Sequence, residues 1–271
     1  MITENKNKLS FLLSRIVITL AVYIGVWRFI AYLNLAFNAP YSPLNHFILA
    51  TLTSILTIVT MQFILKFDRL KWRFLIHIAM KKNLLSFLLG LAIFIFPASI
   101  GLMISITLGT VEIHFMSNII ELLKSFLLLF TTVFLIEAFP EEIIFRGYFY
   151  RLLNRRFTHG VTIILQAILF TIFAYFIGAL YSVDQVMFIP GFAIILGLFR
   201  AISGSVWTSI GFHVALMSVT QILSPIHGHF DVEGMMNLQF FAFILLPSVF
   251  GATILPLLFT SFSWSKVHPD R

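Results

Sequence analysis

The sequence predicts an all-α, polytopic membrane protein of about eight transmembrane helices. Hydrophobic residues make up 59% of the 271 residues and charged residues only 11%, whereas a soluble domain carries roughly 25% charged residues. Apolar runs of the length needed to cross a bilayer, about 20 residues, recur along the whole chain. Lysine and arginine fall almost entirely into alternate connections between these runs. Together these observations predict a single membrane domain over residues 1–271.

Eight apolar runs define the expected spans. They lie near residues 16–35, 47–65, 84–108, 122–139, 161–181, 186–199, 205–223 and 238–262. The sixth run is short and the seventh is the most polar. The first run contains Arg28, and no small-residue cleavage pattern follows it. We therefore expect a retained span and not a signal peptide, with the mature chain starting near Met1.

The distribution of cations predicts the orientation of the spans. One set of connections contains almost all of them: Lys6, Lys8 and Arg15; Lys66, Arg69, Lys71, Arg73, Lys81 and Lys82; Arg146, Arg151, Arg155 and Arg156; Arg200; Lys266 and Arg271. The intervening connections, residues 36–46, 109–118, 182–185 and 224–237, contain neither lysine nor arginine. Because cytoplasmic loops are enriched in these residues, we expect a multi-pass protein of the cell membrane with both termini cytoplasmic.

Composition and charge exclude several other classes. A net charge of +7 is typical of nucleic-acid binding, but these cations are spread between apolar runs, so we expect no nucleic-acid partner. The absence of cysteine excludes disulfides and cysteine-based zinc sites. Arg28 and Lys124 lie inside apolar runs, where they snorkel or pair with Glu121 or Glu137. Residues 67–80 mix aromatic residues with cations, which is typical of a helix in the headgroup layer or of a simple basic loop.

The richest candidate for chemistry is a glutamate cluster at the end of the fourth run. Three of the seven glutamates, Glu137, Glu141 and Glu142, fall within six residues. Pro140 is suited to the first position of a helix, so we expect a new helix whose dipole favours ionised glutamates. Glu142 and Arg146 are four apart and share a helical face, while Glu141 points about 100° away. This spacing predicts one glutamate held by arginine and one free to polarise water; an interfacial ion pair that ends the helix is the alternative.

His213 is the second candidate. Of the eight histidines it alone lies well inside an apolar run, about eight residues or 12 Å from the expected cytoplasmic end. A buried imidazole needs a partner, which is either a functional group or a Ser, Thr or backbone group of a neighbouring helix. Gly204, Ser205, Ser209 and Gly211 are small enough to allow close helix approach, either for plain packing or for a site.

These two segments together resemble a known family. Glu-Glu-x-x-x-Arg-Gly at residues 141–147 is followed by Gly-Leu-x-Arg-x-x-x-Gly-Ser-x-Trp-x-x-Ile-x-x-His at residues 197–213. This order resembles the CPBP family of intramembrane proteases, named for CAAX prenyl protease and bacteriocin processing and also called the Abi family. The resemblance covers roughly the second half of the chain, with a CPBP/Abi-like core expected over residues 122–223.

The resemblance implies roles for four residues and a helical membrane core around them. Glu141 would activate water, Glu142 and Arg146 would brace it, and His213 would help to hold water, a metal ion or the developing oxyanion. These four are the catalytic residues we expect, and Glu141 and His213 would meet in one water-filled pocket that is reachable from the cytoplasmic side.

Two further residues of the family pattern are replaced. The family's Phe-x-x-x-His motif, aligned on Phe170, has Ala174 in place of histidine, and Met217 stands where the family has asparagine or aspartate. Zinc is a cofactor of the family by resemblance, but hydrolytic zinc needs three protein ligands, and Glu141 with His213 falls short of that number. The cofactor is therefore left open. Three nearby polar residues could partly compensate: Thr171, Tyr175 and Ser218.

The sequence leaves two main functions open. The first is a divergent endopeptidase that cleaves a peptide or membrane-anchored substrate with glutamate-activated water. The second is a non-catalytic CPBP-fold scaffold that binds a partner membrane protein or peptide in the same cavity. A third, less favoured function is small-solute transport, which predicts related helical halves with paired helix breaks; the sequence does not contain them. In each case the lipid bilayer surrounds the protein.

Overall fold

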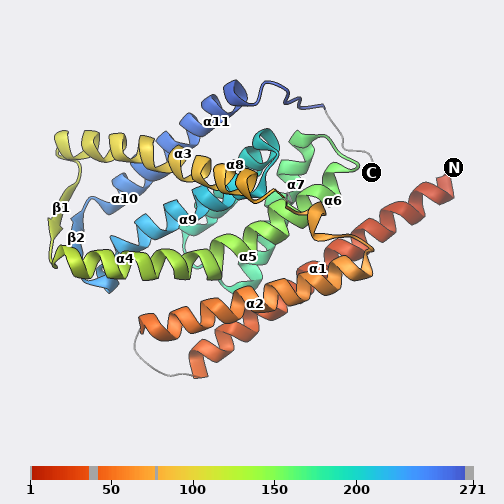
Figure 1. The fold of residues 1–271 in the computed structure, drawn as a ribbon, viewed down its shortest axis with the longest axis horizontal. Helices are drawn as coiled ribbons and strands as arrows, with labels where there is room; N and C mark the ends of the chain where they lie inside the picture. Colours follow the sequence, from red (N-terminus) through yellow and green to blue (C-terminus); the bar gives the residue numbers. More distant parts are fainter. Residues whose placement is uncertain (1, 37–41, 77–78, 266–271) are drawn as a thin grey trace.

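The computed structural model describes residues 2–36, 42–76 and 79–265, without the side chains of residues 2–9 and 36, and this part of the chain is overwhelmingly helical (Figure 1). Its elements are α1 (Ile2–Ala36), α2 (Pro43–Phe67), η1 (Trp72–Phe74), α3 (Met80–Thr107), β1 (Glu112–Phe115), α4 (Ile119–Val133), η2 (Phe134–Ala138), α5 (Phe139–Glu142), η3 (Ile143–Phe149), α6 (Tyr150–Asn154), α7 (His159–Ile177), α8 (Val183–Ser203), α9 (Val206–Ile222), η4 (Pro225–His227), β2 (Phe230–Glu233), α10 (Met235–Asn237), η5 (Leu238–Leu245) and α11 (Leu246–Leu258).

The predicted all-α membrane class is confirmed. Within the described residues, seven helical runs are long and apolar enough to cross a membrane. The eighth apolar helix is α9, which is shorter and corresponds to the most polar expected span. Most of its residues are buried against neighbouring helices, so its composition is set by helix packing more than by lipid. Four of the cations on which the predicted orientation rests have side chains outside the described part of the chain: Lys6, Lys8, Lys266 and Arg271.

The segment that carries the glutamates is one continuous helical run, from Ile119 to Asn154. The expectation that a new helix begins at Pro140 is wrong. The η2 segment just before it is a π-helical turn, in which the Phe139 amide donates to the Phe134 carbonyl five residues back. Such a widened turn relieves the clash that a proline ring makes in a regular helix, and the helix continues. Glu141 and Glu142 therefore lie inside a helix, with no free helix N-terminus beside them.

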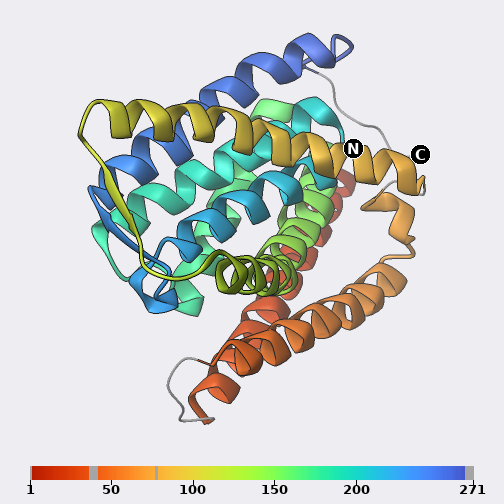
Figure 2. The ribbon, with the colours of Figure 1, turned by 60° about the vertical axis from the view of Figure 1, so that its left-hand side comes forward.

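Helices α1 and α2 form a hairpin along one side of the remaining helices (Figures 1 and 2). Near the cation-rich end, Arg15 Nε lies 2.9 Å from Asp68 Oδ1, and the Tyr148 hydroxyl donates to Asp68 as well. This cluster ties α1 and the end of α2 to the glutamate-bearing run. Of the two alternatives for residues 67–80, a headgroup-layer helix or a basic loop, the described part is closer to the loop, with a turn and the short 3-10 helix η1.

A two-stranded antiparallel sheet closes the opposite end, and the sequence did not predict it. β1 and β2 pair antiparallel, with Glu112 opposite Glu233 and Phe115 opposite Phe230. Ser117 Oγ lies 2.8 Å from His229 Nδ1 and joins the flanking residues. This small sheet connects the end of α3 to the segment that follows α9, at the end of the bundle that contains the connections without lysine or arginine.

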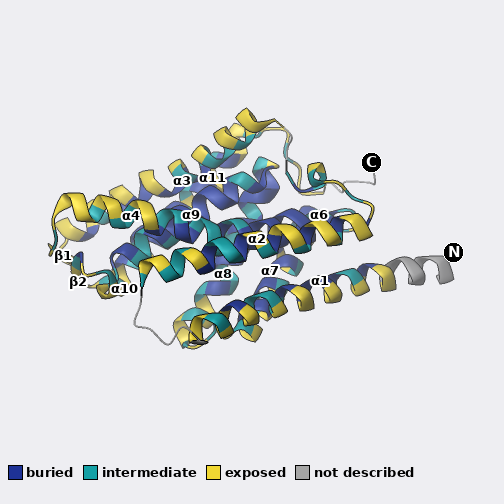
Figure 3. Ribbon diagram, turned by 60° about the horizontal axis from the view of Figure 1, so that its bottom comes forward, coloured by how far each residue is buried: buried dark blue, intermediate teal, exposed yellow. Residues whose placement is uncertain are grey.

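Helices α3 and α9 approach most closely at two glycines. A Cβ added to Gly211 would lie 3.1 Å from the Leu91 amide and closer still to the Phe87 backbone, and one added to Gly90 would lie 2.8 Å from the Phe212 amide. Small residues allow the backbones of membrane helices to approach in this way. The buried residues gather on the inner helices, whereas exposed ones follow the outer faces of α1, α3 and α4 (Figure 3). Of the small residues before His213 that were expected to allow close helix approach, Gly211 does so, whereas no atom lies within 4 Å of a Cβ added to Gly204, and Ser205 caps α9.

This contact predicts the effect of one methyl group. Gly211→Ala places its Cβ against backbone atoms that cannot rotate away, so we expect a loss of about 1–3 kcal/mol of stability. Thermal unfolding of the purified protein in detergent measures this loss. Gly25→Ala is the control, because no atom lies within 4 Å of its added Cβ. Equal melting temperatures for the two variants would contradict the close approach.

The orientation is open to direct measurement because the chain contains no cysteine. Lys82 lies exposed in the first turn of α3, and Glu112 lies exposed beyond the other end of that helix. By the distribution of cations, an impermeant maleimide should label Glu112→Cys on intact cells and Lys82→Cys only after permeabilisation. The reverse pattern would overturn the predicted cytoplasmic location of the termini.

Candidate functional site

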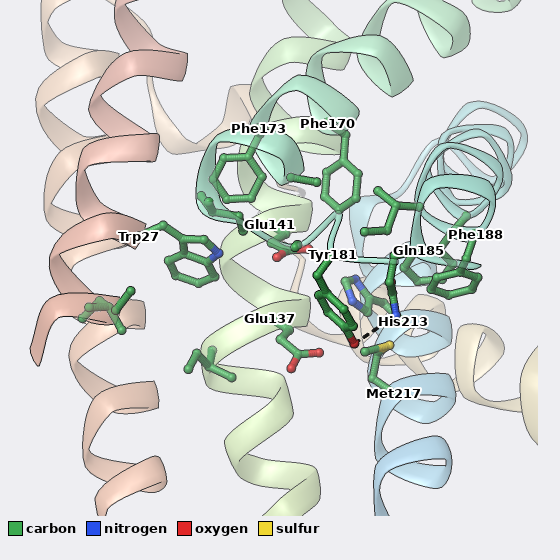
Figure 4. A pocket seen from close by; sticks show the side chains of 18 of the residues that line it. Trp27, Glu137, Glu141, Phe170, Phe173, Tyr181, Gln185, Phe188, His213 and Met217 are labelled. Atoms are coloured by element: carbon green, nitrogen blue, oxygen red, sulfur yellow. Dashed lines mark hydrogen bonds between the residues drawn. The ribbon is translucent and has the colours of Figure 1, made fainter. Parts of the chain in front are cut away.

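The structure brings Glu141 and His213 to one cavity of about 500 Å³ at mid-depth in the bundle. Glu141 comes from α5 and His213 from α9, and both side chains point into the same space (Figure 4). The other walls come from α1, α2, α7 and α8. Aromatic residues dominate these walls, among them Trp27, Phe170 and Phe188. The sequence prediction that this acid and this imidazole share a pocket agrees with the geometry.

Glu142 is the centre of the polar contacts behind the cavity wall. Its Oε1 accepts from Arg146 Nη1 at 3.0 Å and from His213 Nδ1 at 3.1 Å. The side chains of Glu142 and Arg146 are fully buried. The predicted pairing of these two residues, four apart on one helix, is thus present in the structure. The histidine partner is a carboxylate, and not the neighbouring hydroxyl or backbone group that plain packing would supply.

The bond to Glu142 also sets the orientation of the His213 ring. A carboxylate only accepts, so Nδ1 carries the proton and Nε2 is left for other contacts. The Phe192 ring packs edge to face on the imidazole, with centroids 4.9 Å apart. The imidazole is therefore held from two sides, while it still lines the cavity.

Arg146 fastens the glutamate-bearing run to α7 and α8. Its Nη2 donates to the Ala193 carbonyl at 3.2 Å, and its guanidinium lies 4.7 Å from the centre of the Phe170 ring. Gln166 donates to the same Ala193 carbonyl at 2.8 Å. Arg200, which was assigned to the cation-rich face, is buried and donates from Nε to the Arg146 carbonyl at 2.9 Å. Sequence reasoning missed these supporting contacts, since the residues lie on three different helices.

Glu141 differs sharply from Glu142. It is 8% exposed, it lines the cavity, and no described side chain or backbone group forms a hydrogen bond or ion pair with it. The predicted division between one braced glutamate and one free glutamate therefore matches the contacts. A carboxylate in this state has all its acceptor positions available for water or for a ligand.

A third glutamate lines the cavity, and sequence reasoning had assigned it elsewhere. Glu137, considered as a partner for Arg28 or Lys124, instead accepts from Gln221 Nε2 at 3.0 Å. Arg28 and Lys124 are exposed and form no ion pair with a described residue, which fits snorkelling. The spacing of four between Glu137 and Glu141 was the available signal, because residues four apart share a helical face.

Both positions that depart from the family pattern line the same cavity. Ala174 and Met217 face it from α7 and α9, so the two substitutions remove polar groups from the cavity itself. None of the three residues proposed as compensators lines it. Thr171 donates to the Ala167 carbonyl, Tyr175 is largely exposed and Ser218 is buried elsewhere.

The cavity extends from mid-depth toward the end of the bundle that lacks lysine and arginine. Asn34, His46, Tyr181 and Gln185 line this part, and they lie at or beside helix ends on that side. No lining residue comes from the described cation-rich connections. This direction differs from the expected access on the cation-rich, cytoplasmic side, because the Arg146, Arg200 and Tyr150 side chains fill that end of the core.

The residues present do not fit a zinc site. No group of three His, Asp or Glu side chains converges as metal ligands within the part of the chain that the structure describes, whereas hydrolytic zinc needs three. His213 Nδ1 is already bonded to Glu142. His229 bonds Ser117 beside the small sheet, so it does not complete a ligand set at the cavity.

The comparison with protein families bears on the segment that carries these residues. Residues 123–219 match the family described as Type II CAAX prenyl endopeptidase Rce1-like. No curated protein and no solved structure matches the chain significantly. The matched segment includes Glu141, Glu142, Arg146 and His213. The resemblance is thereby confirmed: this multi-pass membrane protein carries, over residues 123–219, a CPBP-family core of the Rce1-like type.

Proposed function

We propose that the protein is an intramembrane endopeptidase that hydrolyses a peptide bond with water activated by Glu141. One observation carries this proposal above the others: the Glu141 carboxylate is buried and unpartnered in a cavity, directly beside a neighbour, Glu142, whose Oε1 is bonded to Arg146 and His213. A purely structural ion pair needs only Glu142 and Arg146. The additional free carboxylate is what a general base requires.

In this proposal each residue has its own step. Glu141 takes a proton from a water molecule as the water oxygen attacks the peptide carbonyl carbon. His213, held through Nδ1 by Glu142, directs Nε2 toward the developing oxyanion, which it stabilises when Nε2 carries a proton. The C–N bond then breaks, and the departing amine receives the proton that Glu141 holds. The carboxylate is regenerated without any further reactant.

A second candidate function rests on a different observation. Ala174 and Met217 line the cavity with apolar atoms where the family places polar ones, and the loss of one transition-state donor typically costs about 100- to 1,000-fold in rate. A non-catalytic scaffold that binds a partner peptide or membrane protein would tolerate both changes. The site contains nothing that favours small-solute transport over either function.

The role of Glu141 predicts a clean loss of cleavage. Glu141→Gln keeps the size of the side chain and breaks no contact in the structure, so the melting temperature should not change, while cleavage should fall at least about 100-fold. Mass spectrometry of membrane peptides reconstituted with the protein measures this. Glu121→Gln, at an exposed position on the same helical run, is the control and should cleave normally. Equal cleavage by both variants would refute the endopeptidase proposal.

The two departures predict a gain of activity. If the cavity retains a working base, Ala174→His combined with Met217→Asn should raise the cleavage rate by about 100-fold or more, since each change returns a donor to the cavity. The same peptide assay measures the rate. The matched control is Tyr175→His, which adds an imidazole one residue along α7 on an exposed side chain. A folded double variant that is no faster than the parent protein would favour the scaffold.

A further inference from the structure

The charges around the cavity do not balance. Glu137 and Glu141 both line it, and no described lysine or arginine does. The nearest guanidinium, that of Arg146, is committed to Glu142 and to the Ala193 carbonyl. Two carboxylates thus lie in a largely apolar space with no lysine or arginine of their own, and the imidazoles of His46 and His213 are the basic groups among the lining residues. Burying a charge without a partner is costly, so the cavity favours a ligand that brings positive charge.

Most of the hydrogen-bond acceptor positions of these two carboxylates are also unused. Gln221 supplies one donor to Glu137, and Glu141, more than nine-tenths buried, receives none from any described residue. Each ionised carboxylate can accept about four hydrogen bonds. The free Glu141 oxygens point toward the interior of the cavity (Figure 4), where a group with several N–H donors would satisfy both acids.

The cavity walls suit the rest of such a ligand. Six aromatic rings line it: Trp27, Phe170, Phe173, Tyr181, Phe188 and Phe192. The faces of aromatic rings attract cations and pack against methylene chains. No three side chains among the described residues converge to hold a metal ion. A bare metal ion would thus lack ligands, while an ammonium or guanidinium group on an apolar stem would contact both the acids and the rings.

We propose that the cavity is a binding subsite for a basic side chain, lysine or arginine, of an otherwise apolar peptide. The ligand's cation contacts Glu137 and one oxygen of Glu141, which leaves the second Glu141 oxygen free for water, and its methylene stem lies along the aromatic walls. The inference rests on the proposed function in that the ligand is a peptide. It adds the chemical class of the residue that the site selects, and it applies equally to a cleaved substrate and to a bound partner.

Calorimetry with the purified full-length protein in neutral detergent tests this inference. The probes are an apolar, end-blocked hexapeptide with one central lysine and the same peptide with norleucine, which keeps the stem and removes the charge. We expect the lysine peptide to bind about ten- to a hundredfold more tightly, the range for a hydrogen bond to a charged group. The net charge of +7 on the chain disfavours any lysine preference of non-specific electrostatic origin.

Two variants locate the preference. In Glu137→Gln combined with Glu141→Gln, the lysine and norleucine peptides should bind equally. In Glu112→Gln combined with Glu121→Gln, two exposed carboxylates outside the cavity, the preference should persist. Equal binding of both peptides to the parent protein, no binding of either, or a lysine preference that survives loss of the cavity carboxylates would each overturn the inference.

The outcome is separable from that of the proposed function. A protein that binds the lysine peptide selectively without cleaving it would retain this subsite and refute the endopeptidase. A protein that cleaves the norleucine peptide as efficiently as the lysine peptide would retain the endopeptidase and refute the subsite.

Discussion

The buried carboxylate of Glu142 is the interaction on which the site depends. It accepts from Arg146 on its own helix and from His213 on α9, and Arg146 in turn holds α8 through the Ala193 carbonyl. An ion pair in a low-dielectric interior is costly to desolvate, and removing one partner typically costs about 3–5 kcal/mol. The arrangement is therefore stable only when all three helices are in place. It fixes the position of the His213 imidazole relative to Glu141, the residue next to Glu142. The packing of the three helices therefore determines how these two side chains face each other.

The packing that permits this geometry lies in the small residues of α9 and α3. Gly211 precedes His213 by two residues and contacts the α3 backbone, while Ser209 donates to the Leu196 carbonyl of α8 at 3.0 Å. A larger residue at either position would move α9 relative to α3 or α8, and with it His213, whose Nδ1 lies 3.1 Å from Glu142 on the glutamate-bearing run. The polar contact between His213 and Glu142 thus depends on the close backbone approach, because a hydrogen bond is lost when its two atoms move apart.

The spans and the pairing of Glu142 with Arg146 were predictable from the sequence, because each follows from a local period or a cation count. The cavity shared by Glu141 and His213 was expected only from the family resemblance, because no local period connects two residues on different helices. The continuous helix through Pro140 was not predictable, because a π-turn is a tertiary accommodation that a proline rule does not anticipate. Glu137 was misassigned for a related reason. Its partner, Gln221, lies 84 residues away, and no local pattern connects the two.

The polar groups of the cavity also follow a geometric order. From Glu141 to Glu137, and from His213 through Met217 to Gln221, each step is one helical turn toward the end without lysine or arginine. The polar residue expected at position 217 is absent, but the next turn restores one, and it is paired with a carboxylate from the facing helix. Relative to the family pattern, a polar side chain therefore lies one helical turn farther toward the end without lysine or arginine. This residue, Gln221, bonds Glu137 and does not itself line the cavity. In the proposed function, the peptide would lie along the line from Glu141 to Glu137, with its reacting carbonyl beside Glu141 and its basic side chain reaching Glu137, one turn closer to the part of the cavity lined by Asn34, Tyr181 and Gln185.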